Sequence, residues 1–317
     1  MPLFHIRHRT HYIYEGLVID SANQLKLYPI QDEFQKVLEH RIQVSASPAI
    51  HTVKDYFGNV TGFFSVLAPH EHLIIDNFLA VETLPRNNAL KNSNGASTWE
   101  AYYAESTHTT FHDFLKPENA ACKHEVQQVI HELMDKKTHP METIQRLSAF
   151  IFKNFTYKKG VTTIETDVDE LWKLKAGVCQ DFAHLLLYML RLLGIPSRYI
   201  SGYICPGTSE WRGEGATHAW AEAWFPDLGW IGVDPTNNCL AEERHVRLAG
   251  GRNFSDCTPV KGTYRGAVDH KLEVTVQFGK EAFNQNEFSS APTFVSSANE
   301  GVSRNSYSAY MQMQQQQ

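Results

Sequence analysis

The chain has 317 residues, of which 42% are hydrophobic, 12% aromatic and 20% charged, the composition of a globular protein long enough for two ordinary domains. Its net charge of −6 provides no global basic field for nucleic acid or acidic lipid, so we expect no nucleic-acid partner and no membrane partner. We see no apolar stretch of signal-peptide length at the start, and no run that approaches a membrane span.

The cysteines are few and scattered. They occur without a CxxC pair, at Cys122, Cys179, Cys205, Cys239 and Cys257. An odd, dispersed set argues against a disulfide framework and against a Cys-rich zinc site. We therefore expect a reduced, cytoplasmic protein.

The first part of the chain is rich in short strand-like runs. Aromatic and β-branched residues gather at 8–16, 39–47, 51–69 and 72–84, and turn signals such as Gly58-Asn59 separate them. This pattern predicts an all-β N-terminal domain over residues 1–88, a small sandwich or barrel. The polar segment at 89–98, which lacks apolar periodicity, is typical of a linker.

Helical patterns follow the linker, and strands follow the helices. Apolar residues recur at helical spacing in 124–136, 141–155 and, most clearly, 179–193, where Gly194 and Pro196 end the pattern. Further strands are predicted at 197–204, 217–225, 229–235 and 271–279. We assign a mixed α+β core to residues 99–283. The Ser-, Asn- and Gln-rich tail at 284–317 is too polar to fold alone and is predicted to be flexible.

Cys179 stands at the predicted start of the buried helix. Unpaired N–H groups and the positive end of the helix dipole favour an anion there, hence a thiolate, and can also hold an oxyanion. A cysteine before a leucine-rich helix is more often structural, so a nucleophile needs a base and an orienting group as well.

The hairpin at 217–235 supplies candidates for both. Strand alternation places His218 and Trp220 on one face of the first strand and Asp234 on the corresponding face of the second. If even positions pair with even positions, Asp234 lies opposite or diagonal to His218, and Gly232 keeps the space between them open. Cys179, His218 and Asp234 together have the layout of a Cys-His-Asp triad.

The stretches GVCQDFAHLLLYMLRLLGIPSRYISGYI and THAWAEAWFPDLGWIGVDPTNN closely resemble the bacterial transglutaminase-like superfamily, whose members are often described as cysteine proteases. The N-terminal stretches HRTHYIYEG and DYFGNVTGFFS resemble that family's N-terminal β domain. The resemblance covers roughly residues 1–280. It implies a papain-like core, with the nucleophile's helix on an antiparallel sheet, and assigns the triad to Cys179, His218 and Asp234.

Several assignments stay open at this point. We expect a cysteine-dependent hydrolase of amide, peptide or isopeptide bonds, with protein-glutamine transamidation by the same triad as the alternative and a non-catalytic binding module as the second alternative. Gln180 and Trp220 are candidates for oxyanion or cleft support, whereas Asp181 and His184 are expected to be structural. We expect no cofactor and no metal; His5, His8 and His11 cannot converge on one ion from a regular strand.

Overall fold

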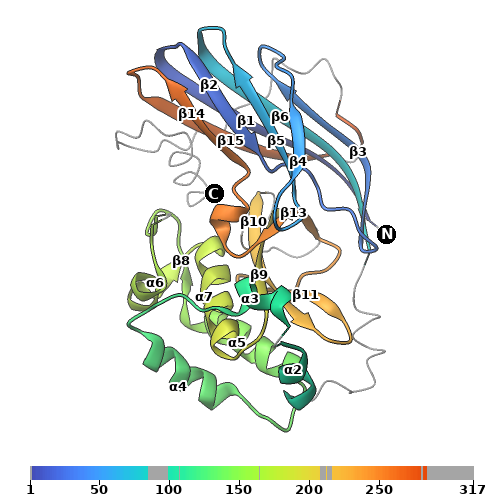
Figure 1. The fold of residues 1–317 in the computed structure, drawn as a ribbon, viewed down its shortest axis with the longest axis vertical. Coiled ribbons are helices and arrows are strands. Elements are labelled where there is room, and N and C mark those ends of the chain that lie inside the picture. The colour runs from blue at the N-terminus through green and yellow to red at the C-terminus, as the bar shows by residue number, and fades with distance from the viewer. Residues whose placement is uncertain are drawn as a thin grey trace.

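The computed structural model describes residues 2–84, 99–106, 108–163, 165–207, 212, 216–279 and 281–283. The expected linker at 89–98 and the tail at 284–317 lie outside these residues, so both assignments stay predictions. The described chain forms a β sandwich stacked on a mixed α/β core (Figure 1). None of the helices in these ranges is long and apolar enough to cross a membrane.

Two four-stranded antiparallel sheets make the sandwich, with strand orders β15-β1-β6-β3 and β14-β2-β5-β4. Buried side chains alternate along the strands, as Ile6, Tyr12 and Tyr14 do on β1, and both sheets contribute to one apolar cluster. The strands are β1 (Leu3–Val18), β2 (Asp20–Leu25), β3 (Gln35–Val44), β4 (His51–Lys54), β5 (Val60–Val66), β6 (His70–Thr83), β14 (Val260–Arg265) and β15 (His270–Gly279).

The last two strands belong with the first ones. β15 pairs with β1 along ten positions, from His5↔Gly279 to Tyr14↔His270, and β14 pairs with β2. We expected this stretch in the core at 99–283, so its pairing is a correction. The strand at 271–279 has the correct type and place in the sequence, but its partner lies some 260 residues away, a separation that local patterns cannot reveal.

The core consists of helices around a five-stranded sheet of order β12-β11-β10-β9-β13. The predicted helices at 124–136, 141–155 and 179–193 are present as α4, α5 and α7. The elements are α2 (Trp99–Ser106), η1 (Thr109–Phe111), α3 (His112–Leu115), α4 (Lys123–Leu133), α5 (Pro140–Asn154), β7 (Thr156–Tyr157), α6 (Val168–Leu174), β8 (Ala176–Gly177), α7 (Cys179–Leu192), β9 (Ser197–Ile204), β10 (Thr217–Phe225), β11 (Gly229–Asp234), β12 (Cys239–Leu240), β13 (His245–Gly251) and η2 (Phe254–Asp256).

Helix α7 is the centre of the core. Its side chains from Phe182 to Leu190 are almost all inaccessible to solvent, and it packs against β10 and β9 as well as α5 and α6. A helix that is apolar on most sides must lie inside a domain. The prediction of a buried helix that carries Cys179 at its first turn, packed on an antiparallel sheet, is confirmed.

The sandwich and the core meet through buried polar contacts as well as apolar ones. Gln35 on β3 accepts a hydrogen bond from the backbone N–H of Arg247 at 2.7 Å and donates to the Arg247 carbonyl at 2.8 Å. The Arg247 guanidinium donates to Asp32 at 2.7 Å. His8, from the histidine-rich start of the chain, is buried and lies 2.9 Å from the Tyr203 hydroxyl of β9.

We predict that Gln35→Leu lowers the free energy of unfolding by about 1–3 kcal/mol, because it leaves the Arg247 N–H buried without an acceptor. Denaturant or thermal unfolding of the full chain measures this loss. Gln127→Leu, at an exposed position of α4, is the control and should leave the stability almost unchanged. Equal stability of the two variants would contradict a structural role for the Gln35 bridge.

Candidate active site

Cys179 is the first residue of α7 and is half-buried. The turn before it is fixed by Asp181, whose Oδ2 accepts hydrogen bonds from the Val178 N–H at 2.8 Å and the Thr162 hydroxyl at 2.7 Å. A Cβ at Gly177 would lie only 2.6 Å from this oxygen, so glycine is required before the nucleophile candidate. Asp181 therefore has the structural, capping role that we expected.

Burial raises the pKa of Asp181 to about 6, while the bonds from Val178 and Thr162 act in the opposite direction. His184, one turn further along α7, accepts a hydrogen bond from the Phe254 N–H at 3.1 Å, and burial lowers its pKa to about 4. Both side chains thus support the helix rather than the chemistry.

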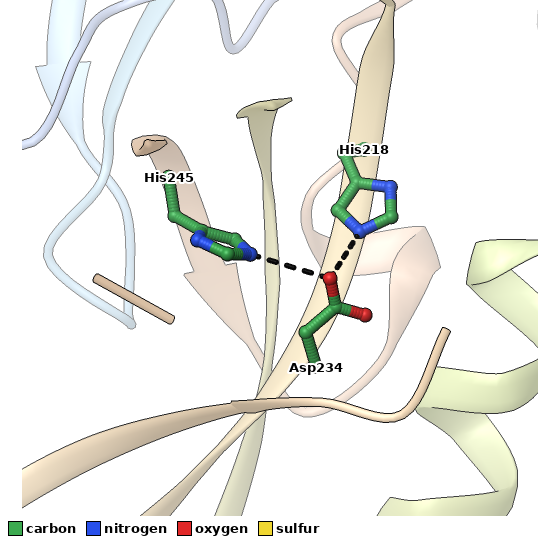
Figure 2. Close-up of side chains that lie close together, drawn as sticks. All are labelled: His218, Asp234 and His245. Carbon is green, nitrogen blue, oxygen red and sulfur yellow. Dashed lines mark hydrogen bonds and ion pairs between the residues drawn. The ribbon is translucent and has the colours of Figure 1, made fainter. Parts of the chain in front are cut away.

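His218 and Asp234 meet across the hairpin. The register pairs even positions with even positions, as in Glu222↔Gly232 and Trp224↔Trp230, which places Asp234 diagonal to His218. His218 Nε2 lies 2.9 Å from Asp234 Oδ2, and both side chains are inaccessible to solvent (Figure 2). Gly232 has a different role from the expected one. A Cβ there would meet Ala241 at 2.5 Å and the Trp220 indole nitrogen at 3.2 Å, so Gly232 makes room for Ala241.

Both oxygens of Asp234 are held by N–H donors. Oδ1 accepts from the backbone N–H groups of Thr236 at 2.8 Å and Asn237 at 3.3 Å. Oδ2 accepts from the Asn237 side-chain amide at 2.8 Å in addition to His218, and His245 Nε2 lies 3.3 Å from it. Five donors around one carboxylate favour its ionised form and fix its orientation.

The opposite charges of His218 and Asp234 stabilise each other and shift both pKa values. Burial alone lowers the pKa of His218, but the charge of Asp234 and then of the Cys179 thiolate outweigh it and raise the pKa to about 10. Burial alone raises the pKa of Asp234, whereas the charge and hydrogen bond of His218 move it far below its ordinary range. At neutral pH the pair is therefore an imidazolium and a carboxylate.

The second ring nitrogen of His218 points away from Asp234 (Figure 2). This Nδ1 is buried and has no hydrogen-bond partner among the described residues. The charge of Cys179 contributes to the raised pKa of His218, so the thiol lies near the ring. The three candidate residues, from α7, β10 and β11, thus lie in one region of the core.

His245 is the member of the cluster that our reading of the sequence missed. It begins β13, a strand we did not predict, because the polar–apolar alternation of His-Val-Arg-Leu is short and gives way to Ala-Gly-Gly. Its approach to Asp234 depends on a chain crossing that no local pattern reveals.

The ligating atoms of His218, Asp234 and His245 lie within 4.8 Å of one another, a spacing that a metal ion could use. The Asn237 amide argues for hydrogen bonding instead. Its oxygen accepts from the Arg212 N–H at 2.8 Å, so its NH₂ group must face Asp234 Oδ2, where a cation would bind. We interpret the cluster as a hydrogen-bonded network.

Gln180 and Trp220, the candidates for oxyanion or cleft support, are both buried. Gln180 lines a cavity of about 250 Å³ beside the first turns of α7, and its Oε1 has no partner among the described residues. Trp220 is fully inaccessible and packs between His218 and His245, with ring centroids 6.2 Å and 4.9 Å away. Trp220 therefore lies behind the histidines and forms no exposed cleft wall.

Two family models match the chain. Residues 127–235 match the transglutaminase-like superfamily, and residues 4–82 match the bacterial transglutaminase-like N-terminal region. An uncharacterized protein of Mycobacterium tuberculosis is 32% identical over 292 residues, which cover 86% of this chain and 91% of that protein. The chain belongs to the transglutaminase-like superfamily, and the resemblance seen in its motifs is confirmed.

Two further similarities concern the fold and the core. A crystal structure from Cytophaga hutchinsonii, named "Putative Cysteine Protease", has a TM-score of 0.64 at 18% identity, covering 90% of this chain and 93% of that one. A protein-glutamine gamma-glutamyltransferase of Pseudomonas aeruginosa is 34% identical over 123 residues, 35% of this chain and 18% of that protein. The predicted papain-like fold behind an all-β N-terminal region is confirmed, and family membership supports a cysteine-based enzyme.

We predict that Asp234→Asn moves the pH midpoint of iodoacetamide labelling at Cys179 to higher pH. The variant loses the charge that raises the pKa of His218, so the imidazolium that stabilises a thiolate is lost at lower pH. We expect turnover to fall by roughly 10–10³-fold, less than the ~10⁴-fold of the serine-protease example, because a thiol depends less on its base.

Asp227→Asn, in the exposed turn of the same hairpin, is the matched control and should reproduce the parent profile. Mass spectrometry of the Cys179 peptide distinguishes this cysteine from the others. Superimposable profiles for Asp234→Asn and the parent would return Asp234 to a purely structural role.

Proposed function

We propose that Cys179, His218 and Asp234 form a catalytic triad that hydrolyses an amide, peptide or isopeptide bond in a peptide or protein substrate. The observation that carries the proposal is the buried 2.9 Å pair of His218 and Asp234, which lies near enough to Cys179, at the start of α7, for the charge of Cys179 to raise the pKa of His218. A base oriented by a carboxylate beside a thiol is the arrangement that activates a cysteine nucleophile.

The reaction follows from these positions. The Cys179 thiolate attacks the substrate carbonyl carbon, and the oxyanion forms beside the N–H groups of the first turn of α7. The C–N bond then breaks, and the leaving amine takes the proton of the His218 imidazolium. A thioester remains on Cys179. Water attacks it, His218 accepts a proton from that water, and the carboxylic acid product leaves with the thiolate restored.

Transamidation by the same triad is the second candidate, since an amine in place of water would yield a new amide. The Pseudomonas aeruginosa relative, by its name a protein-glutamine gamma-glutamyltransferase, favours it over the matched part of the core. Hydrolysis remains the preferred reaction because the Cytophaga hutchinsonii structure, which is named as a cysteine protease, covers 90% of this chain, whereas the gamma-glutamyltransferase covers 35%.

A cytoplasmic location is part of the proposal. All five cysteines carry free thiols, three of them buried, which suits a reducing compartment. A fractionation experiment on the native organism, with a cytoplasmic marker and a secreted marker, tests this location, and recovery with the secreted marker would refute it.

We predict that Cys179→Ala abolishes turnover of a peptide library, a loss of about 10³-fold or more, while the melting temperature stays close to that of the parent. The half-buried thiol contributes little packing, so the fold does not depend on it. Cys239→Ala, at another half-buried cysteine, is the control and should retain activity. Equal turnover by Cys179→Ala and the parent would refute Cys179 as the nucleophile, whereas no turnover by the parent on any member of the library would favour the binding-module alternative.

We predict that water is the main acceptor of the acyl group. Incubation of a glutamine-containing peptide and an isopeptide with millimolar amounts of a small amine should give mostly the hydrolysis product, as measured by mass spectrometry in ¹⁸O-labelled water. A dominant amine adduct would identify transamidation as the reaction and refute the preference for hydrolysis, while the triad would stand.

A further inference from the structure

The segment between β12 and β13 crosses the face of the sheet that carries His218. β12 lies at one edge beside β11, and β13 lies at the other edge beside β9. Between them, the Ala241 N–H donates to the Gly232 carbonyl at 2.9 Å, and the Arg244 carbonyl accepts from the Cys205 N–H at 2.8 Å. The crossing ends at His245, which begins the strand at the opposite edge and lies 3.3 Å from Asp234 Oδ2 (Figure 2).

The tautomer of His245 follows from its two neighbours. Nδ1 accepts a hydrogen bond from the Glu242 backbone N–H at 3.3 Å, so this nitrogen carries no proton. In the neutral ring the proton is then on Nε2, which donates it to Asp234 Oδ2 at 3.3 Å. Burial lowers the pKa of His245, so the ring is neutral at ordinary pH.

The groups that face His245 come from each element packed against it. They are Asp234 of β11, the His218 imidazolium of β10 and Arg244 beside it in the chain, and the two cations disfavour a positive charge on His245. The Trp220 ring lies edge-on at 4.9 Å. His245 is therefore held as a neutral N–H donor to a buried anion.

The position of His245 is set by the β sandwich. Two residues further along β13, Gln35 of β3 bonds both the N–H and the carbonyl of Arg247, and Asp32 pairs with the Arg247 guanidinium. These contacts tie the strand that carries His245 to the N-terminal domain. The sandwich thus supports the strand whose first residue, His245, contacts Asp234.

We propose that His245 is a positioning residue that acts on the triad through Asp234: its neutral N–H takes up part of the negative charge of Oδ2 and so limits the charge that this oxygen presents to His218. The inference rests on the proposed function, because it requires that Asp234 sets the protonation of His218 beside Cys179. None of the assigned triad roles includes this side chain.

The effect of removing the His245 donor on the pKa of His218 has a definite direction. A carboxylate that loses a hydrogen bond becomes more basic and holds the His218 imidazolium more strongly. His218 is already an imidazolium at neutral pH, so the stronger hold appears at alkaline pH: the pH at which His218 loses its proton should rise. This direction is opposite to that expected for Asp234→Asn, which removes the charge altogether.

The test compares His245→Leu with His245→Gln in the full chain, by the pH at which the His218 ring loses its proton, followed by its histidine-ring NMR signals. The two side chains are similar in size, but only glutamine keeps an N–H donor that can reach Asp234. We expect the leucine variant to raise the deprotonation midpoint of His218 by about 0.5 unit or more, and the glutamine variant to follow the parent. His245→Met replaces the leucine variant if that chain does not fold.

A double-variant cycle separates this inference from the proposed function. In an Asp234→Asn background, His245→Leu should produce no further shift, because its effect passes through the carboxylate. If Asp234→Asn lowers the His218 midpoint but leucine and glutamine at 245 give the same midpoint, the role of His245 is refuted while the triad stands. A shift of the His218 midpoint to lower pH in the leucine variant, or one that persists in the Asp234→Asn background, also refutes it. If Asp234→Asn leaves the His218 midpoint unchanged, the proposed triad and the role of His245 fail together.

Discussion

The constraint on which the site depends is the burial of one ionised carboxylate. Asp234 is completely inaccessible, and an unpaired charge in such a position would cost several kcal/mol. It is compensated by N–H donors from three separate places: the turn after β11, His218 on β10 and His245 on β13. The fold must therefore hold the hairpin, its following turn and a distant strand in fixed register, because the loss of any donor leaves the others to stabilise the same charge.

Because of this constraint, the sandwich contributes to the geometry of the proposed active site. Its two sheets are completed by β14 and β15, which follow the core in sequence but pair with β2 and β1. The chain thus leaves the sandwich, builds the core and returns through β13, whose backbone is held by Gln35. Tyr203, Val246 and Leu248 of the core share the apolar cluster of the sandwich. The sandwich and the core consequently share a buried interface, which includes β9 and β13, the strands beside the proposed triad.

The parts that the sequence predicted are those governed by local pattern. Helical periodicity located α7, and period-two alternation placed His218 and Asp234 on one face of the hairpin, with the correct register. The family resemblance of the Cys, His and Asp motifs then connected three local signals. Other features escaped prediction. The alternation of β13 covers only His245–Leu248 before Ala-Gly-Gly, His245 reaches Asp234 by a chain crossing, and β15 pairs with a strand near the start of the chain.

The charges around His218 also suit the two halves of the proposed reaction. The thiolate of Cys179 contributes to the raised pKa of His218, so the ring is protonated when a leaving amine needs an acid. Once Cys179 is acylated its negative charge is gone, and this contribution disappears from the ring. The pKa of His218 must then fall, which favours the neutral form that takes a proton from water. Without the hydrogen bond from His245, Asp234 would be more basic and would oppose this fall in the pKa of His218. The ring would then stay protonated both before and after acylation of Cys179. The hydrogen bond from His245 weakens the hold of Asp234 on the proton, so a residue outside the triad can adjust the balance between acylation and deacylation.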